Sequence, residues 1–248
     1  MAEIMALTDD RPKKALSYPN GDGEVYSRTV RELEGIGVEG IISAGDLEIG
    51  GIKVLGKGCV GIVLAGVLGR QSIALKVLRT DANRPSLMNE GRLLTMANGC
   101  RAGPQIIAAG ANVLAMEYVH GKPLVKWLGE LHTPGEVKSA LRELLRQARC
   151  LDEIGLDHGE LSDARKHILI DEKGRPYILD FETASTDRKL RNLISTVGYL
   201  FFKSSTAALL SRHITWDRAG LLGAAREYKD APSKKTYENL ITHLGLLD

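Results

Sequence analysis

The sequence predicts an α+β protein in which a small strand-rich part precedes a larger helical part. Short runs of aliphatic and β-branched residues, separated by glycine, fill residues 47–78. From residue 133 onwards, apolar residues recur mainly at helical spacing. A chain of 248 residues is long enough for two small lobes, each with its own core. We therefore expect a bilobal molecule.

The composition is ordinary for a globular protein and excludes several other classes. Hydrophobic residues make up 44% of the chain, charged residues 26%, and the net charge is +2. This balance gives no direct signal for binding nucleic acid or an anionic membrane, and no apolar run is long enough to cross a bilayer. The chain start lacks the apolar core of a signal peptide. Three widely spaced cysteines, Cys59, Cys100 and Cys150, fit no CxxC metal site, and their odd number suggests a reducing compartment. We expect a cytoplasmic protein.

Residues 1–46 are expected to form an N-terminal extension. Residues 17–23 are dense in turn-forming residues, so the chain up to about residue 23 is expected to be poorly structured. A short helix should follow, because Tyr26, Val30 and Leu33 recur at helical spacing before Gly35 and Gly37. Packing on the next lobe is the expected role of this helix, and binding a partner is the alternative.

Residues 47–119 are expected to form the strand-rich lobe. The runs 52–55, 62–65 and 72–78 predict a three-stranded antiparallel meander. A helix is expected at residues 85–97, with Pro85 in its first turn. Two further strands are expected at residues 105–108 and 112–117.

Residues 120–248 are expected to form the helical lobe. Thr133, Pro134 and Glu136 form a capping box with proline at the first helical position, which predicts a long helix up to about residue 154. A hairpin should join residues 168–170 to residues 177–179. The expected helices that follow are 187–203, 204–212, 216–228 and 234–244.

The glycine-rich segment 56–63 reads G-K-G-C-V-G-I-V, which matches G-x-G-x-x-G-x-V. A Rossmann loop shares the first part of this pattern but opens a helix, whereas an apolar strand follows Gly61. Between two strands, Gly56, Gly58 and Gly61 would bring backbone amides close to the phosphates of a nucleotide. The alternative is a glycine-rich hairpin without a ligand.

The run Ile73-Ala74-Leu75-Lys76 has the form of the V-A-I-K strand of kinases. Strand alternation places Ala74 and Lys76 on one face, with the small residue against an adenine and the ammonium near the phosphates. A lysine within an apolar strand needs a counter-charge, and Glu90, 14 positions later, is the expected partner. The alternative for Glu90 is a solvated helix glutamate.

Residues 115–124 look like the segment that joins the two lobes of a kinase. The backbone groups of Glu117 to Val119 would bind the adenine edge, and Met116 would lie at the back of that pocket.

Two further segments make the resemblance specific. The run H-G-E-L-S at residues 158–162 resembles the H-G-D-L-S of small atypical kinases, namely the RIO kinases and the kinase subunit of the KEOPS complex. The run D-F-E at residues 180–182 resembles the magnesium-binding D-F-G. The resemblance covers about residues 54–200. It implies a bilobal protein-kinase-like fold, the use of ATP and Mg²⁺, and transfer of the γ-phosphate to a serine or threonine hydroxyl.

The chain departs from the family pattern at three positions. Glu160 stands where the family has the catalytic aspartate, and it would orient the acceptor hydroxyl. Asp163, three residues on, is the alternative base. His167 takes the place of a metal-binding asparagine and would hold the magnesium ion together with Asp180. Glu182 replaces the glycine of D-F-G, as in aminoglycoside and choline phosphotransferases.

Neighbouring residues of this loop have less specific expected roles. His158 is expected to brace the loop rather than take part in chemistry. Arg165 and Lys166 either supply positive charge for the transferred group or are solvated loop charges.

The segment after residue 182 lacks A-P-E, so the peptide-docking segment of ordinary protein kinases is reduced to a few residues. The preferred function is a serine/threonine protein kinase whose partners are ATP and a protein substrate or a partner complex. A small-molecule kinase and a nucleotide-binding pseudokinase or ATPase scaffold are the alternatives.

Overall fold

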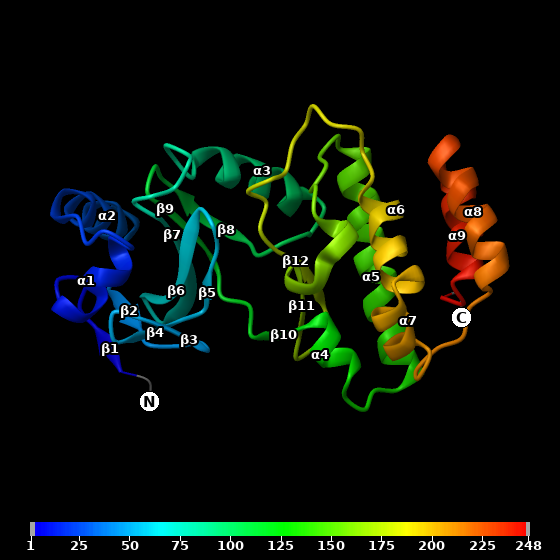
Figure 1. Ribbon diagram of the computed structural model, residues 1–248, viewed down its shortest axis with the longest axis horizontal. Helices are drawn as coiled ribbons and strands as arrows, with labels where there is room; N and C mark the ends of the chain where they lie inside the picture. The colour runs from blue at the N-terminus through cyan, green and yellow to red at the C-terminus, as the bar shows by residue number, and fades with distance from the viewer. Residues whose placement is uncertain (1–2, 247–248) are drawn as a thin grey trace. The chain divides into compact units, whose positions relative to one another are not determined.

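The structure is a computed structural model that describes residues 3–246. The chain divides into two compact units, which Figure 1 shows with their element labels. Unit 1 contains the residues up to Asn98 together with Pro104–Val119, and unit 2 contains Gly99–Gly103 together with the residues from His120 onwards. Unit 1 is rich in strands and unit 2 is mostly helical, which confirms the predicted α+β class.

An antiparallel sheet forms the centre of unit 1. Its strand order is β1-β2-β6-β7-β9-β8, and β5 pairs with β6 off this path. Two long strands, β6 and β7, pair over eight residues each, and β9 lies on the far side of β7. The members are β1 (Ile4–Met5), β2 (Gly40–Ile42), β5 (Gly56–Lys57), β6 (Gly61–Leu68), β7 (Gln71–Leu78), β8 (Ile106–Ala109) and β9 (Val113–Glu117).

The predicted first strand of the meander is divided between two pairings. Residues 52–54 form β4 (Ile52–Val54), which pairs with β3 (Leu47–Ile49) in a separate two-stranded sheet. Two residues later β5 pairs with β6, and between them the amide of Leu55 donates to the carbonyl of Val63. The chain therefore changes partner within one extended run, which alternation of residue types does not reveal.

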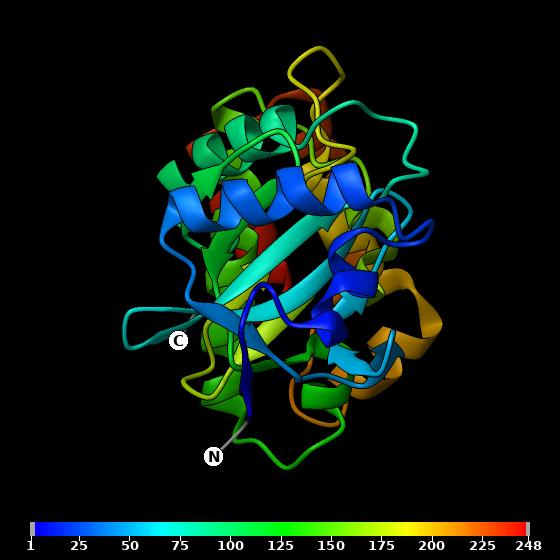
Figure 2. The same ribbon diagram turned by 90° about the vertical axis from the view of Figure 1, so that its left-hand side faces the viewer.

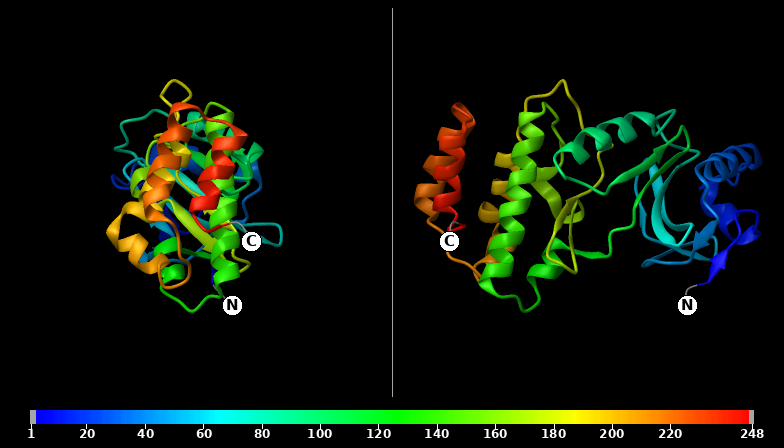
Figure 3. Two further views of the ribbon diagram at one scale, coloured as in Figure 1. Left: turned by 90° about the vertical axis from the view of Figure 1, so that its right-hand side faces the viewer. Right: turned by 180° about the vertical axis from the view of Figure 1, so that it is seen from behind.

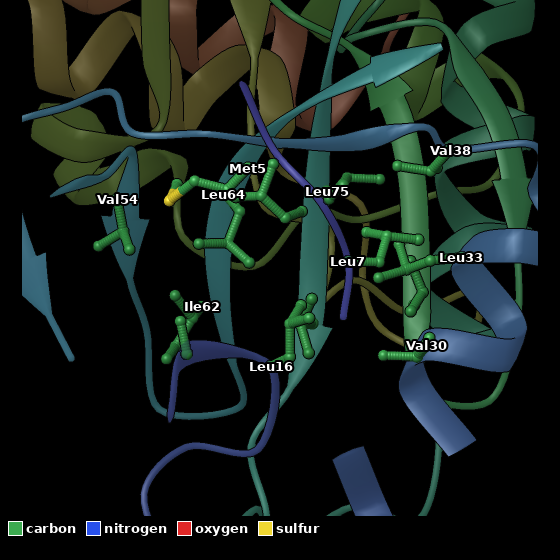
Figure 4. Packing of buried hydrophobic residues seen from close by; sticks show 14 of the residues in the cluster. Met5, Leu7, Leu16, Val30, Leu33, Val38, Val54, Ile62, Leu64 and Leu75 are labelled. Atoms are coloured by element: carbon green, nitrogen blue, oxygen red, sulfur yellow. The ribbon is translucent and has the colours of Figure 1, made fainter. Parts of the chain in front are cut away.

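The two faces of β7 have different partners. Ile73, Leu75 and Val77 point into the hydrophobic core of unit 1, as alternation along a strand requires. This core also contains residues of the N-terminal elements, as the labelled Leu16, Leu33 and Leu75 show in Figure 4. Ala74 and Lys76 consequently face the opposite side of the sheet.

The described N-terminal residues form regular elements, so the expectation of a poorly structured segment up to residue 23 is wrong for residues 3–23; residues 1–2 lie outside the described part of the chain. The described residues form β1, α1 (Asp10–Leu16) and the predicted helix, α2 (Gly23–Ile36), which lies across the sheet in Figure 2. Asp9 caps α1 and Asp22 caps α2 through their side chains. Val30 and Leu33 of α2 are buried in the core, which confirms packing on the lobe as the role of this helix.

The remaining helix of unit 1, α3 (Met88–Gly99), packs on β8 and β9. Gly91 allows this contact, because a Cβ there would lie 2.4 Å from the Cβ of Ala109. The helix begins three residues after Pro85 and ends at Gly99, two residues beyond the expected range. It carries Glu90 in its first turn.

The long helix α5 (Pro134–Glu153) is the centre of unit 2 and is prominent in the right-hand view of Figure 3. The predicted capping box is present: the Thr133 hydroxyl accepts from the amide of Glu136, and the Glu136 carboxylate accepts from the amide of Thr133. Its buried face includes Val137, Leu141 and Leu144. A pair of helices, α8 (Arg218–Asp230) and α9 (Lys234–His243), lies side by side in the same view.

A three-stranded sheet of order β10-β11-β12 holds the predicted hairpin. Its strands are β10 (Gly121–Pro123), β11 (Ile168–Asp171) and β12 (Pro176–Ile178). The short helix α4 (Leu124–Leu128) follows β10, and the 3-10 helix η1 (Leu161–Lys166) precedes β11. The hairpin thus sets the positions of the residues just before β11 and just after β12.

The helix predicted at residues 187–203 begins later than expected. Residues 186–191 contain no helix; α6 (Asn192–Val197) continues into a π-helical turn, η2 (Gly198–Phe202), and α7 (Ser204–Leu210) follows. The side chain of Asp152 accepts hydrogen bonds from the amides of Asn192 and Leu193, so it caps this helix from α5. Because this cap comes from a residue 40 positions away, the sequence around residue 192 does not indicate where the helix begins.

Cys100 and Cys150 form a disulfide within unit 2, whereas Cys59 is free and exposed. The Cα atoms of Cys100 and Cys150 lie 5.6 Å apart although 50 positions separate the two residues in sequence. This pairing depends on the fold and does not follow from the spacing of the cysteines. The argument for a reducing compartment from cysteine number no longer applies.

No single helix within residues 3–246 combines the length and the apolar character needed to span a membrane. The bent pair Asn192–Phe202 and Ser204–Leu210 meets those two criteria only when both helices are counted together.

Candidate active site

The glycine-rich segment of unit 1 is a tight turn between β5 and β6, as the sequence predicts. The amide of Gly58 donates to the carbonyl of Gly61 across the turn at 2.8 Å. A Cβ at Gly61 would lie 2.9 Å from the Cγ of Lys76 and 3.1 Å from the carbonyl of Val77. Glycine is therefore required at position 61 for β6 to pass so close to Lys76.

Lys76 and Glu90 form the predicted ion pair. The Lys76 Nζ lies 2.8 Å from the Glu90 Oε1, and the two side chains are 6% and 5% exposed. Strand β7 presents the lysine on the face away from the N-terminal helices, and α3 presents the glutamate. A pair this deeply buried costs desolvation energy, so an arrangement of this kind is more typical of a functional requirement than of stability alone.

The end of β9 holds the predicted adenine-binding segment. The amide of Glu117 donates to the carbonyl of Gln105, and the Glu117 Oε2 accepts from the amide of Gln105. Val119 is the last residue of unit 1. Adenine binding by the backbone of residues 117–119 stays a prediction.

The N-terminal extension contacts the glycine-rich turn through Tyr18, a contact that the sequence did not indicate. The Lys57 Nζ donates to the Tyr18 hydroxyl at 2.6 Å, and the Arg79 guanidinium lies 5.3 Å from the Tyr18 ring centroid. Arg79 also donates to the carbonyl of Gly58 at 2.9 Å. Tyr18 therefore contacts the turn at Lys57, and Arg79 contacts it at Gly58.

In unit 2, His158 braces the loop that carries Glu160. Its side chain is buried, its Nε2–H donates to the carbonyl of Leu179, and its Nδ1 accepts from the amide of Glu160 at 3.4 Å. Burial lowers the pKa of His158 to about 4, so the ring is neutral at pH 7. These contacts agree with the expected bracing role.

The structure brings together Glu160, His167 and Asp180, which are spread over 21 positions of the sequence. One donor atom from each lies within 4.8 Å of the other two, and the Glu160 Oε2 is 3.8 Å from the His167 Nε2. The hairpin explains the proximity, because His167 directly precedes β11 and Asp180 follows β12 by two residues. Asp180 has a φ of 68°, a left-handed conformation that is uncommon outside glycine and found often at functional sites.

This cluster fits a divalent cation. It offers two carboxylates and one imidazole, a donor set that divalent ions accept. The His167 Nδ1 is buried and has no hydrogen-bond partner within residues 3–246, so the protein does not fix the tautomer of the ring through a second hydrogen bond. Both predicted metal ligands, His167 and Asp180, belong to the cluster, and Glu160 joins them.

Asp163 lies outside this cluster. Its carboxylate accepts hydrogen bonds from Arg165 at 2.7 Å and from Lys203 at 2.7 Å. These hydrogen bonds, that from Arg165 first, hold the pKa of Asp163 well below its usual range, which makes the carboxylate a poor base. Arg165, which the sequence offered as a charge for the transferred group, is instead paired with Asp163.

Arg188 is a residue of this loop region that sequence reasoning missed. Its Nε lies 3.1 Å from the buried Asp157 Oδ2, and its Nη2 donates to the carbonyls of Asp157 and Thr183. Gly159 has a φ of 93°, and a Cβ there would lie 2.5 Å from that Nη2. The glycine of H-G-E therefore leaves the space that the Arg188 guanidinium fills. In the sequence, this glycine was the available sign that another group lies close to the loop.

Asn192 also contacts the loop that carries Glu160. Its Oδ1 accepts from the amide of His158, and its Nδ2 donates to Asp152 Oδ1 and to the carbonyl of Leu156. Burial raises the pKa of Asp152, although the hydrogen bonds it accepts act in the opposite direction. The loop is thus fixed by α5, α6 and the segment after residue 182.

Residues 72–192 match the family model of the RIO domain. This segment begins within β7 and ends at Asn192, so it includes Lys76, Glu90, Glu160 and Asp180. A search of curated proteins gave no match to the chain. This match, together with the fold and the buried lysine–glutamate pair, supports an atypical RIO-like kinase.

Proposed function

We propose that the chain transfers the γ-phosphoryl group of ATP to a serine or threonine hydroxyl of a protein. The observation that carries this proposal is the buried ion pair of Lys76 and Glu90, beside a glycine turn that admits no side chain at position 61. The RIO match supports kinase or ATPase chemistry in general. The acceptor and the preference for serine or threonine belong to the proposal.

In unit 1 the proposed task is to hold the nucleotide. The backbone amides of the turn from Gly56 to Gly61 would bind phosphate oxygens, and Lys76 would contact the α- and β-phosphates. Glu90 fixes the position of the ammonium, and Ala74 leaves room for the adenine on the same face of β7. Backbone groups of residues 117–119 would bind the adenine edge.

In unit 2 the proposed task is to position the metal ion and the acceptor. Asp180 and His167 would hold a divalent cation, expected from the sequence to be Mg²⁺, which supplies charge stabilisation for the phosphates when bound. Glu160 would orient the acceptor hydroxyl and accept its proton. The hydroxyl oxygen then forms a bond to the γ-phosphorus, the bond to the β,γ-bridging oxygen breaks, and ADP leaves with that electron pair.

An ATPase scaffold is the second candidate, and the loop geometry favours it over a small-molecule kinase. Asp163 is held by two cations, so Glu160 is the carboxylate of this loop left to act on the acceptor side. Its extra methylene moves the carboxylate relative to an aspartate, and a misplaced base slows transfer to a hydroxyl. Water, which needs no docking, would then be the acceptor.

The decisive experiment combines the full chain with γ-labelled ATP, a divalent cation and general protein substrates. We expect label on the chain or on the substrate, recovered as phosphoserine or phosphothreonine after hydrolysis. The change Lys76→Met removes the ammonium and Glu90→Gln removes its partner, so each should reduce transfer by at least about a hundredfold. Lys53→Met, on the exposed side of β4, is the matched control and should leave transfer unchanged.

The outcomes separate the candidates. Release of phosphate without protein labelling, lost in Lys76→Met, would replace the kinase proposal by the ATPase scaffold. Labelling of small alcohols alone would point to a small-molecule kinase. Nucleotide binding with a background rate that neither Lys76→Met nor Glu90→Gln changes would overturn both kinase candidates and leave a nucleotide-binding scaffold.

A further inference from the structure

The cluster of Glu160, His167 and Asp180 contains an imidazole where an all-oxygen set would suit Mg²⁺. Magnesium binds nitrogen reluctantly, whereas imidazole is a good ligand for first-row transition cations. The donor set on this loop is therefore unusual for a site that serves Mg²⁺ alone. Its composition bears on which cation the protein selects.

The imidazole of His167 is held in place by the backbone and by packing. Its amide donates to the carbonyl of Ala164 at the end of η1, and its carbonyl accepts from the amide of Leu179 at 2.8 Å. The ring of His158 packs against it edge-on, with centroids 5.6 Å apart. The side chain is 15% exposed, so the ring has little room to leave the cluster.

The polar atoms of this ring have few partners within the protein. The Nε2 faces the Glu160 Oε2 at 3.8 Å, which is too long for a hydrogen bond, and the Nδ1 has no partner within the described residues. A buried imidazole without hydrogen bonds is costly unless a ligand takes up its lone pair. An oxygen of each neighbouring carboxylate lies within reach of the same position.

We propose that Glu160, His167 and Asp180 bind a divalent transition cation of the Mn²⁺ or Fe²⁺ kind in preference to Mg²⁺, with a nitrogen of His167 as a ligand. The inference rests on the proposed function only for the purpose of the cation, because the binding itself needs no nucleotide. Glu160 contributes its Oε2 and keeps its Oε1 for the acceptor hydroxyl. The selectivity comes from His167, because the other two donors are carboxylate oxygens that suit either kind of ion.

The test uses Mn²⁺ alone as the probe, added to the full chain after chelation and without ATP. Loss of the free-ion signal in electron paramagnetic resonance gives the affinity for Mn²⁺, and competition gives the affinity for Mg²⁺. Spin-echo modulation reports whether nitrogen is bound, and ¹⁵N labelling of histidine identifies that nitrogen as an imidazole. We expect histidine modulation in the wild type and binding of Mn²⁺ at least about tenfold tighter than of Mg²⁺.

Two variants assign the nitrogen to its residue. His167→Asn supplies an oxygen in place of the nitrogen, so the histidine modulation should vanish and the ratio of the two affinities should fall by about tenfold or more. His243→Asn makes the same change on α9, where the histidine pairs with Asp217, and should alter neither. If His167→Asn does not fold, the labelled wild type still decides whether an imidazole binds the ion, and absence of histidine modulation there overturns the inference.

Absence of Mn²⁺ binding, or binding without histidine modulation, would overturn the inference. Equal affinities for Mn²⁺ and Mg²⁺ would overturn it as well. Phosphoryl transfer supported by Mg²⁺ would then still leave the proposed function standing. Conversely, histidine modulation in a chain that shows no nucleotide turnover would support the metal site and contradict the function.

Discussion

Arg188 connects the segment after residue 182 to the loop that carries Glu160. The change Arg188→Met keeps much of the side-chain length but leaves the buried Asp157 carboxylate without its cation. Removing one partner of a buried pair costs more than the pair contributes, although Arg188 is 43% exposed and solvent screens part of the interaction. We expect a loss of about 1–3 kcal/mol in the free energy of unfolding, measured with urea.

The matched control is Arg165→Met. Arg165 pairs with Asp163, and both side chains are largely exposed, so this change should lower the free energy of unfolding much less than Arg188→Met does. Hydrogen exchange at residues 157–160 should accelerate in Arg188→Met and not in Arg165→Met. Equal effects of the two changes would contradict a specific role for Arg188.

His158 gives the stability a predictable dependence on pH. Its pKa is about 4 in the folded chain and 6.5 as the reference value, so the unfolded chain binds more protons between these limits. The contribution of His158 to the free energy of unfolding should therefore be fully present above pH 6.5. It should decrease as the pH falls towards 4, by up to about 3 kcal/mol. Unfolding in urea with a chelator, at several pH values, measures the slope, which His158→Gln should reduce. An unchanged slope in the variant would assign the pH dependence to other groups.

At the scale of residues, the sequence predicted the pairs that follow a spacing and missed the contacts that need the fold. Lys76 and Glu90 were found because a lysine within an apolar strand requires a counter-charge. Glu160, His167 and Asp180 were each singled out, but only the hairpin brings them together. Arg188 and Tyr18 lie in segments whose composition indicates loops, so nothing local pointed to their partners.

At the scale of elements, the N-terminal helices behave as part of the core of unit 1. Leu33 of α2 is fully buried, in one cluster with Leu64 of β6 and Leu75 of β7. Replacing it by alanine should lower the free energy of unfolding by about 2–5 kcal/mol, because a cavity remains. Thermal or urea unfolding measures the change. Glu34→Ala, one position on at an exposed site of the same helix, should change stability by less than about 0.5 kcal/mol.

A small effect of Leu33→Ala would mean that α2 is only loosely attached to the sheet. The expected effect would instead show that α2 helps to bury the apolar residues 73, 75 and 77, which lie on the face of β7 opposite residues 74 and 76. One face of β7 is closed by the N-terminal helices, and the other face carries Lys76.

Elements with strong local signals were predicted well. The capping box located the start of α5, and apolar spacing located α2. The start of α6 was predicted five positions too early, because its cap comes from Asp152 on α5. The helix α1 was missed because seven residues give too short a period to recognise.

At the scale of the whole molecule, the chain crosses between the two units more often than the predicted linear order of lobes implies. Gly99–Gly103 belongs to unit 2, although α3 before it and β8 after it belong mainly to unit 1. This short segment holds Cys100, whose carbonyl also accepts a hydrogen bond from Arg146 of α5. The chain passes between unit 1 and unit 2 three times, and composition along the sequence does not reveal such a boundary.

The disulfide between Cys100 and Cys150 fixes this segment to α5. It closes a loop across 50 positions, and restricting the unfolded chain to that extent should stabilise the fold by about 4 kcal/mol in the chain-entropy account. A thiol reductant should therefore lower the melting temperature of the wild type. The same reductant should not affect a Cys100→Ala/Cys150→Ala double variant, whereas Cys59→Ser, which changes the exposed free thiol, should respond as the wild type does. Alkylation of the folded, unreduced chain should modify one cysteine; modification of three, with no thermal shift on reduction, would show that the bond does not form in the protein.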